Sequence, residues 1–219
     1  MKTYNDIMKV LKPLEQELLQ VATYLEPDGS QNCVIIMDND PTRFVETLKP
    51  LSSFARGKRL PYPLIIDRSF LMSSRDSYPL ELLNFSHQYT NLYSREDLLK
   101  VLSFDKQDMR LQMERELKSK LLLTRMAILE GRKSEGELNR IIRRSILAIC
   151  PVLKGFLYLS GAGIPSSFDN LLNNCQQILS LNLAILKACL EEKRSTLNTA
   201  VDYLALINAL LIKLDEINL

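Results

Sequence analysis

Two aspartates spaced one residue apart close the short apolar run NCVIIMDND at residues 32–40. Alternate residues of a β-strand point to the same side, so the carboxylates of Asp38 and Asp40 can converge on one cation. Mg²⁺ prefers oxygen ligands and commonly takes one or two carboxylates together with substrate phosphates. A third carboxylate on a neighbouring strand would complete the site, with Glu81 as the candidate and Asp76 as a less direct one. This arrangement predicts metal-dependent nucleotidyl or phosphoryl transfer.

A Gly-Ser pair, Gly29 and Ser30, lies upstream of the aspartates. A turn of this composition can offer backbone N–H groups to a phosphate. A structural interpretation of the aspartates is also open, and the sequence favours it. Asp40 precedes Pro41 and fits a helix N-cap followed by proline at the first helical position, while Asp38 fits a solvated strand end.

The order Gly-Ser, Asp-x-Asp and LELLNF, with the stretches DSYPLELLNF and RLQMERELKSKL, resembles a group of bacterial nucleotidyltransferase-like proteins. In that group a small DNA-polymerase-β-like palm domain precedes a helical domain similar to the kanamycin nucleotidyltransferase C-terminal domain and to HEPN domains. The resemblance covers residues 25–160. It implies Mg²⁺ held by Asp38, Asp40 and Glu81, and the phosphates of ATP or another nucleoside triphosphate touched by Gly29 and Ser30.

Two functions of different classes remain open. Active members of the group carry Gly-Ser after a strand, with a longer spacer before the acidic pair. Here the preceding segment predicts a helix, and only seven residues separate Ser30 from Asp38. This favours a degenerate pseudoenzyme that acts as a binding or scaffolding module. The alternative is a Mg²⁺-dependent enzyme that transfers a nucleoside monophosphate to a small molecule or protein.

The first half of the chain predicts a small mixed sheet with helices. A helix over residues 3–24 is expected because apolar residues recur at helical spacing, at Ile7, Val10, Leu11, Leu14, Leu18, Val21 and Ala22. Strands are expected at residues 33–37, 60–67 and 78–85, helical segments at residues 40–54 and around Phe70, and a hairpin or loop at residues 86–94.

The second half predicts helices alone, which is typical of an antiparallel helical bundle. The expected helices cover residues 96–102, 106–130, 135–160, 166–191 and 195–217. The sequence thus predicts an α+β protein, with a nucleotidyltransferase-like α/β domain at residues 1–104 and a helical bundle domain at residues 105–219.

Charged residues interrupt the apolar stripe of the helix expected at residues 106–130. Arg110, Glu114 and Arg125 share that stripe with leucines at helical spacing. One interpretation is a cleft between the domains, in which the arginines bind phosphate. The favoured interpretation is an interdomain charge cluster, with an Arg110–Glu114 pair and Arg125 docked on an acid of the first domain.

The composition argues against several classes of protein. A net charge of +2 predicts no strong attraction to nucleic acid or anionic membrane. The apolar runs are short for a membrane span, and the charged N-terminus lacks a signal-peptide core, which predicts a cytoplasmic protein. The single histidine, His87, argues against a histidine-based zinc site, a catalytic triad and a HEPN-type ribonuclease site. The four cysteines lack a Cys-x-x-Cys pair and are expected to be buried thiols.

The helix expected at residues 195–217 is more apolar than one bundle contact requires. This predicts that its face around Leu206, Leu210 and Lys213 packs against a second copy or another protein. Complete burial within the monomer is the alternative.

Overall fold

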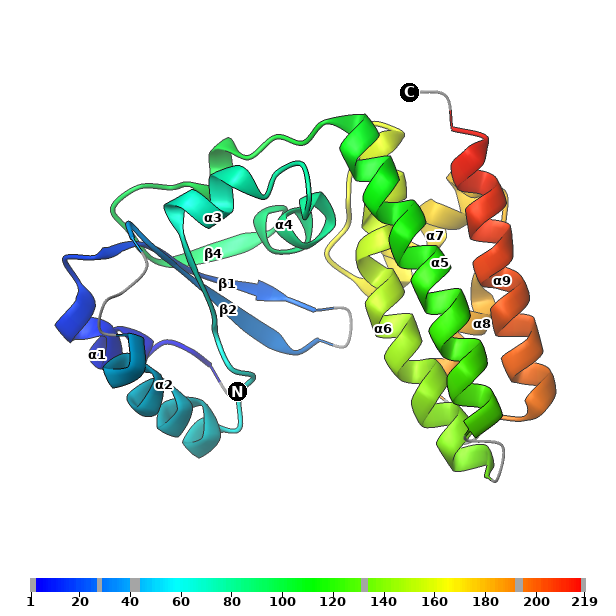
Figure 1. The fold of residues 1–219 in the computed structure, drawn as a ribbon, viewed down its shortest axis with the longest axis horizontal. Helices are drawn as coiled ribbons and strands as arrows, with labels where there is room; N and C mark the ends of the chain where they lie inside the picture. Colours follow the sequence, from blue (N-terminus) through cyan, green and yellow to red (C-terminus); the bar gives the residue numbers. More distant parts are fainter. Residues whose placement is uncertain (1–2, 27–28, 40–43, 131–133, 192–194, 218–219) are drawn as a thin grey trace. The chain divides into compact units, whose positions relative to one another are not determined.

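The computed structural model describes residues 3–26, 29–39, 44–130, 134–191 and 195–217. It confirms a mixed α+β protein with a small sheet followed by a set of helices (Figure 1). The chain divides into two compact units, Met1–Phe104 and Asp105–Leu219.

Unit 1 contains a four-stranded mixed sheet in the order β3-β2-β1-β4. Its elements are α1 (Ile7–Leu11), η1 (Lys12–Leu14), β1 (Leu18–Leu25), β2 (Gln31–Met37), α2 (Phe44–Lys58), β3 (Leu64–Asp67), α3 (Arg68–Ser73), α4 (Pro79–Ser86), β4 (Tyr89–Ser94) and η2 (Leu99–Val101). Strand β1 pairs antiparallel with both β2 and β4, whereas β2 and β3 are parallel and are joined through α2. Parallel strands require such a crossover connection.

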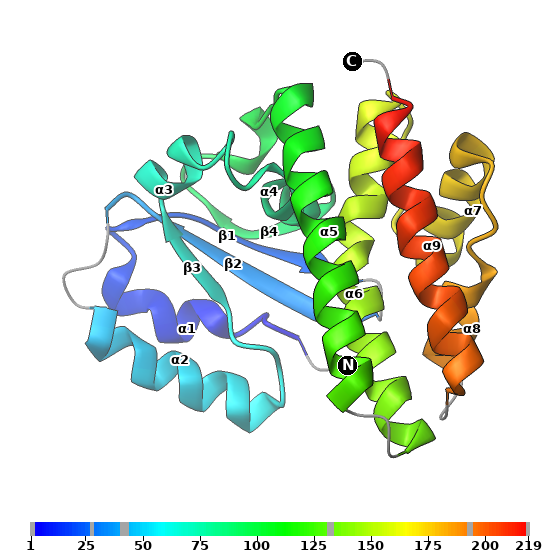
Figure 2. The ribbon, with the colours of Figure 1, turned by 45° about the vertical axis from the view of Figure 1, so that its right-hand side comes forward.

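Helices cover both faces of this sheet. Figures 1 and 2 show α1 and α2 on one face and α3 and α4 on the other. On the α1–α2 face, alternate residues of β2 (Cys33, Ile35 and Met37) join a buried core with Ile7 and Leu11. The central strands are therefore covered on both sides and read as nearly continuous apolar sequence.

The helix predicted over residues 3–24 is wrong for its second half. Helix α1 ends at Leu11, and the residues from Leu18 to Leu25 form the central strand β1. Leu18, Val21 and Ala22 are fully buried, because this strand has neighbours on both edges and helices on both faces. A strand buried on both faces loses the apolar–polar alternation by which strands are recognised.

Two neighbouring segments of unit 1 have a different secondary structure from the one predicted. Residues 78–85 were expected to form a strand, but Pro79–Ser86 is helix α4 with Pro79 in its first turn. Residues 86–94 were expected to form a hairpin or loop, but Tyr89–Ser94 is the edge strand β4. The strand predicted at residues 33–37 is confirmed as β2, and the strand predicted at residues 60–67 is confirmed from Leu64 onward as β3. The predicted cap at Asp40 lies outside the described residues.

Unit 2 is built from helices in the part of the chain that the structure describes. They are α5 (Lys106–Glu130), α6 (Glu135–Leu159), α7 (Phe168–Leu179), α8 (Ala184–Glu191) and α9 (Leu197–Asp215). The single helix predicted over residues 166–191 is in fact two helices. The chain breaks at Ser180, whose φ of 51° lies in the left-handed region, and Asn182 Oδ1 accepts the backbone N–H of Ala184 at the start of α8.

A buried chain of hydroxyl groups links three helices of unit 2. Tyr203 of α9 donates to Ser145 Oγ of α6 at 2.7 Å. Thr124 Oγ1 of α5 lies 3.0 Å from the same Ser145 Oγ. Each of these polar groups has a partner away from water, as buried polar groups require. These hydrogen bonds also fix how far α5 and α9 are shifted along the axis of α6.

Helix α9 is long and apolar enough, by length and composition alone, to cross a membrane, and it is the one described helix that meets this criterion. Helices buried in protein cores also meet it. Ile207 and Leu210 are fully buried in unit 2, and Leu206 is 7% exposed. Leu206 and Leu210 therefore face the interior of the bundle, whereas Lys213 is partly exposed. The packing of this helix against a partner stays a prediction.

Candidate functional site at the strand ends of the sheet

The sheet topology places the last residues of β2, β3 and β4 and the first residues of β1 at the same end of the sheet. Met37 of β2 pairs with Asp67 of β3, so the residues that follow them, Asp38 and Arg68, are neighbours. Strand β1 runs antiparallel to β2 and begins at this end of the sheet. Here the backbone N–H of Asp38 donates to the carbonyl of Glu17 at 2.9 Å. Strand β4 ends here, and Glu96 follows it.

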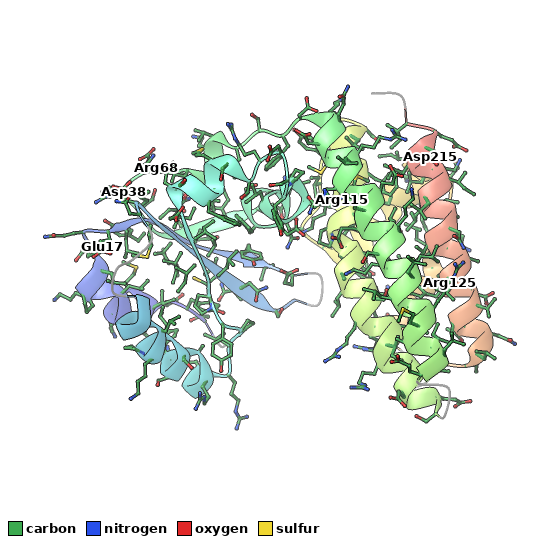
Figure 3. All side chains as sticks on the ribbon, in the orientation of Figure 1. Glu17, Asp38, Arg68, Arg115, Arg125 and Asp215 are labelled. Atoms are coloured by element: carbon green, nitrogen blue, oxygen red, sulfur yellow. The ribbon has the colours of Figure 1, made fainter. Side chains whose placement is uncertain are left out.

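We call Glu17, Asp38, Arg68, Arg95 and Glu96 the strand-end rim. Figure 3 shows Glu17, Asp38 and Arg68 at one end of the sheet. The backbone N–H groups of Arg95 and Glu96 both donate to the carbonyl of Leu19, and Arg95 Nη1 donates to the carbonyl of Gln16 at 2.7 Å. These contacts hold the segment after β4 against the start of β1.

Arg68 is the centre of the rim. Its Nη1 and Nη2 donate to the two carboxylate oxygens of Glu96 at 2.9 and 2.5 Å. Its Nε donates to Asp38 Oδ1 at 3.2 Å. Arginine provides a planar fork of donors that matches a carboxylate in this two-point manner. Arg68 therefore occupies oxygens of two carboxylates that a bound cation would need.

The electrostatics of the rim follow from these contacts. The hydrogen bonds to Glu96 raise the pKa of the Arg68 guanidinium above its ordinary value. The hydrogen bonds from Arg68 lower the pKa of the Glu96 carboxyl. The side chains of Arg68, Asp38 and Glu96 are 36%, 47% and 48% exposed, so solvent screens the pairs and a ligand can reach them.

The predicted metal ligands are not brought together by the described residues. Asp38 lies on the rim, and Asp40 lies outside the described residues. Glu81 lies in the first turn of helix α4 and not on a strand. The last turn of that helix contacts the opposite end of the sheet, where Asn84 Nδ2 donates to Glu26 Oε1 at 3.2 Å. Since an eight-residue helix is about 12 Å long, α4 holds Glu81 near that end.

The predicted phosphate turn also lies at the opposite end of the sheet. Gly29 has a φ of 78° in the turn between β1 and β2, where its N–H donates to the carbonyl of Glu26 at 2.9 Å. The seven residues of β2 separate this turn from Asp38. At about 3.3 Å per residue the strand spans roughly 20 Å. Gly29 and Ser30 cannot share a ligand of nucleotide phosphate size with Asp38.

Among the described residues, no group of three His, Cys, Asp or Glu side chains is placed so that it could hold a metal ion. The four cysteines are buried and form no disulfide, as predicted. Burial raises the pKa of the Cys33 thiol to about 12 and that of the Cys175 thiol to about 12. Protonated, buried thiols are poor nucleophiles and poor metal ligands.

The predicted interdomain charge cluster has local partners within unit 2. Arg110 Nη2 pairs with Asp215 Oδ1 of α9 at 3.1 Å, and its Nε donates to the carbonyl of Leu214. Glu114 pairs with Lys118, four residues later in the same helix. Arg125 is exposed. In place of the predicted Arg110–Glu114 pair, Arg110 pairs with Asp215 and Glu114 with Lys118, although Arg110 also helps to lower the pKa of the Glu114 carboxyl.

A second polar cluster lies beside the rim and is centred on a buried glutamine, with partly or fully exposed partners. Gln20 of β1 is fully buried and donates to Asn91 Oδ1 and Asp97 Oδ1 at 2.8 and 2.7 Å. Its own Oε1 accepts the backbone N–H of Leu99. Tyr89 donates to Asp97 Oδ1 at 2.6 Å. We call Gln20, Tyr89, Asn91 and Asp97 the Gln20 network; it fixes the segment that carries Glu96.

Arg68 and Glu96 are not among the site residues that were predicted from the sequence. Arg68 directly follows the predicted strand LIID, so its place at the end of β3 was available from the pattern. Glu96 was not available in the same way, because the strand before it reads YTNLYS and carries little apolar signal. Without β4 in the sheet, nothing in the sequence places Glu96 beside Asp38.

Comparisons with known proteins add no relative to this geometry. No family model, no curated protein and no solved structure matches the chain.

Proposed function

We propose that this chain is a catalytically inactive protein of nucleotidyltransferase-like fold that acts as a binding or scaffolding module. The observation that supports the proposal is the position of Arg68, whose guanidinium binds both Asp38 and Glu96. A guanidinium in this position supplies the positive charge that a metal ion would bring to an active site. Three of its five N–H groups donate to these carboxylates, so oxygens that a metal ion would bind are already hydrogen-bonded.

The separation of the other predicted groups supports the same proposal. Asp38 and the Gly29–Ser30 turn lie at opposite ends of β2, so one nucleotide cannot contact both. The rim carries three carboxylates, at Glu17, Asp38 and Glu96, and two guanidinium groups, at Arg68 and Arg95, for a net charge of −1. Such a mixed and exposed surface suits contact with a polar protein surface better than capture of a metal–triphosphate complex.

The test is calorimetric titration with ATP in the presence of Mg²⁺. For the wild-type protein we expect no Mg²⁺-dependent heat of binding.

A second measurement uses the variant Arg68→Gln, in which the carboxylates of Asp38 and Glu96 lose their cationic partner. We expect weak Mn²⁺ binding to appear in this variant, measured by electron paramagnetic resonance of the free ion. Arg56→Gln, a change at an exposed arginine of α2, is the matched control and should bind no Mn²⁺.

The opposite result would support the Mg²⁺-dependent nucleotidyltransferase. Wild-type protein would then bind ATP with Mg²⁺ at micromolar concentration, and Asp38→Asn would abolish that binding without changing the circular dichroism spectrum. Incorporation of label from α-³²P-ATP into a co-purified molecule or protein would decide the matter against the proposal.

A further inference from the structure

Helix α5 carries an apolar stripe on the side that faces away from α6. Leu111, Leu122, Met126 and Leu129 are 53%, 59%, 56% and 69% exposed. Leu122 and Met126 each lie two residues from Thr124, which reaches Ser145 of α6. Two residues along a helix correspond to a rotation of about 200°, so these side chains point away from α6.

Helix α9 carries a matching stripe. Leu197, Val201 and Ile212 are 54%, 57% and 60% exposed. Val201 lies two residues from Tyr203, which also reaches Ser145, so Val201 points away from α6 in the same manner. Helices α5 and α9 are neighbours in Figures 1 and 2, and their stripes form one surface, which we call the α5–α9 face.

The two helices are antiparallel, and charged residues lie at both ends of the α5–α9 face. Arg110 near the start of α5 contacts Asp215 at the end of α9. Arg125 near the end of α5 is exposed and has no ion pair with any residue that the structure describes. Figure 3 shows Arg125 and Asp215 well separated along the helices. Arg110 precedes Arg125 by fifteen residues, which is about 22 Å of helix.

We propose that a second copy of this chain packs on the α5–α9 face, about a two-fold axis that crosses the helices at right angles. Such an axis exchanges the two ends of the face, so Arg125 of each copy meets Asp215 of the other. The same operation brings Leu111 of one copy next to Leu122 of the other. An interface between identical copies is self-complementary in this way, because the contact of one residue with another is repeated in reverse.

Two further positive charges of α5 lie near the proposed axis. Lys118 is paired with Glu114 of its own helix. Arg115 is exposed and lies seven residues before Leu122, which places it about 20° from Leu122 and within the stripe. The carboxylate of Asp215 is 71% exposed and is bonded by Arg110 through Oδ1, so it can accept a second cation.

The size of the face is sufficient for a reversible dimer. Helix α9 has 19 residues, and two adjacent helices of that length present on the order of 600 Å² per copy. Two such surfaces reach the lower end of the area that specific protein interfaces bury, about 1,200 Å² in total. For a small interface of this kind we expect association at micromolar concentration.

The test is sedimentation velocity of the full chain over a range of micromolar concentrations. We expect a monomer–dimer equilibrium, and we expect Arg125→Glu and Asp215→Arg each to weaken dimerisation by about tenfold or more, because like charges then meet twice. An equimolar mixture of the two variants should dimerise like the wild type, since each contact is again between opposite charges. Arg125 and Asp215 of one copy are too far apart for rescue within one chain.

Arg144→Glu, a change at an exposed arginine of α6, is the matched control and should leave the equilibrium unchanged. Thermal melts followed by circular dichroism establish that each variant is folded. A monomer at all concentrations, or a dimer insensitive to Arg125→Glu, would overturn the proposal. Flotation of wild-type monomer with vesicles of one-third phosphatidylserine, abolished in Leu122→Asp, would instead assign the face to an anionic membrane.

Discussion

The strand-end rim and the Gln20 network are two polar clusters that adjoin each other in unit 1 and differ in their exposure to solvent. In the rim, Arg68 binds two carboxylates that are about half exposed. In the network, a fully buried Gln20 binds one carboxylate, one amide and one backbone N–H. The comparison teaches that the network holds the fold, whereas the rim remains available to a ligand, although the rim carries the greater charge.

The largest effect is expected from Gln20→Leu. The substitution keeps the approximate volume of the side chain but leaves the buried backbone N–H of Leu99 without its partner. An unsatisfied buried group of this kind costs about 1 to 3 kcal/mol. Urea unfolding followed by circular dichroism should show that loss. A midpoint equal to that of the wild type would mean that the Gln20 network does not hold this part of the fold.

An intermediate effect is expected on acidification. Burial raises the pKa of Asp97, but hydrogen bonds from Tyr89, Gln20 and Asn91 outweigh burial and lower it below its ordinary value. An acid whose pKa is lowered on folding contributes stability above its unfolded pKa, about 3.9, and loses it as the pH falls through the folded value. The stability of the wild type should therefore fall as the pH decreases below about 4.

Two variants separate the clusters in that experiment. Asp97→Asn should flatten the decline of stability with acid, because its carboxyl no longer takes up a proton on unfolding. Glu96→Gln should flatten it less, since solvent screens the Arg68–Glu96 pair even though the pKa of Glu96 is also lowered. Urea midpoints between pH 3 and pH 6 measure both slopes, and a larger change for Glu96→Gln would reverse the ranking of the two clusters.

The smallest effect is expected from Arg68→Gln. It removes the contacts of the rim to Asp38 and Glu96, yet exposed ion pairs contribute little to stability in water. The urea midpoint should stay within the scatter of replicate wild-type measurements. A loss comparable to that of Gln20→Leu would show that the rim is a structural element, and it would weaken the case for the rim as a binding surface.

The class of fold could be predicted because apolar residues recur at helical spacing throughout the second half of the chain. Helices α5 and α6 fill the predicted ranges 106–130 and 135–160 to within one residue, since Ser134 accepts the N–H of Glu137 as an N-cap and the loops between helices are polar. The break at Ser180 was hidden, because a left-handed residue at the end of a helix is usually glycine and here it is serine.

The sheet and its rim could be predicted only in part. Strand β2 and strand β3 were visible as short β-branched runs, and Asp38 was correctly placed at a strand end. Strand β1 was hidden by burial on both faces, and β4 by its polar edge sequence. The rim depends on the register among all four strands, which is a long-range property that no local pattern encodes.

The place of β1 between β2 and β4 has a consequence during synthesis of the chain on the ribosome. Gln20 and its partner Asn91 lie 71 residues apart, so β1 and β2 can pair long before β4 has left the exit tunnel. Until then one side of β1 is an open, apolar edge, of the kind that adds strands from other chains. Because pairing over a long sequence separation is slow, we expect co-translational chaperone contact to be concentrated on nascent chains in which Tyr89–Ser94 has not yet left the exit tunnel.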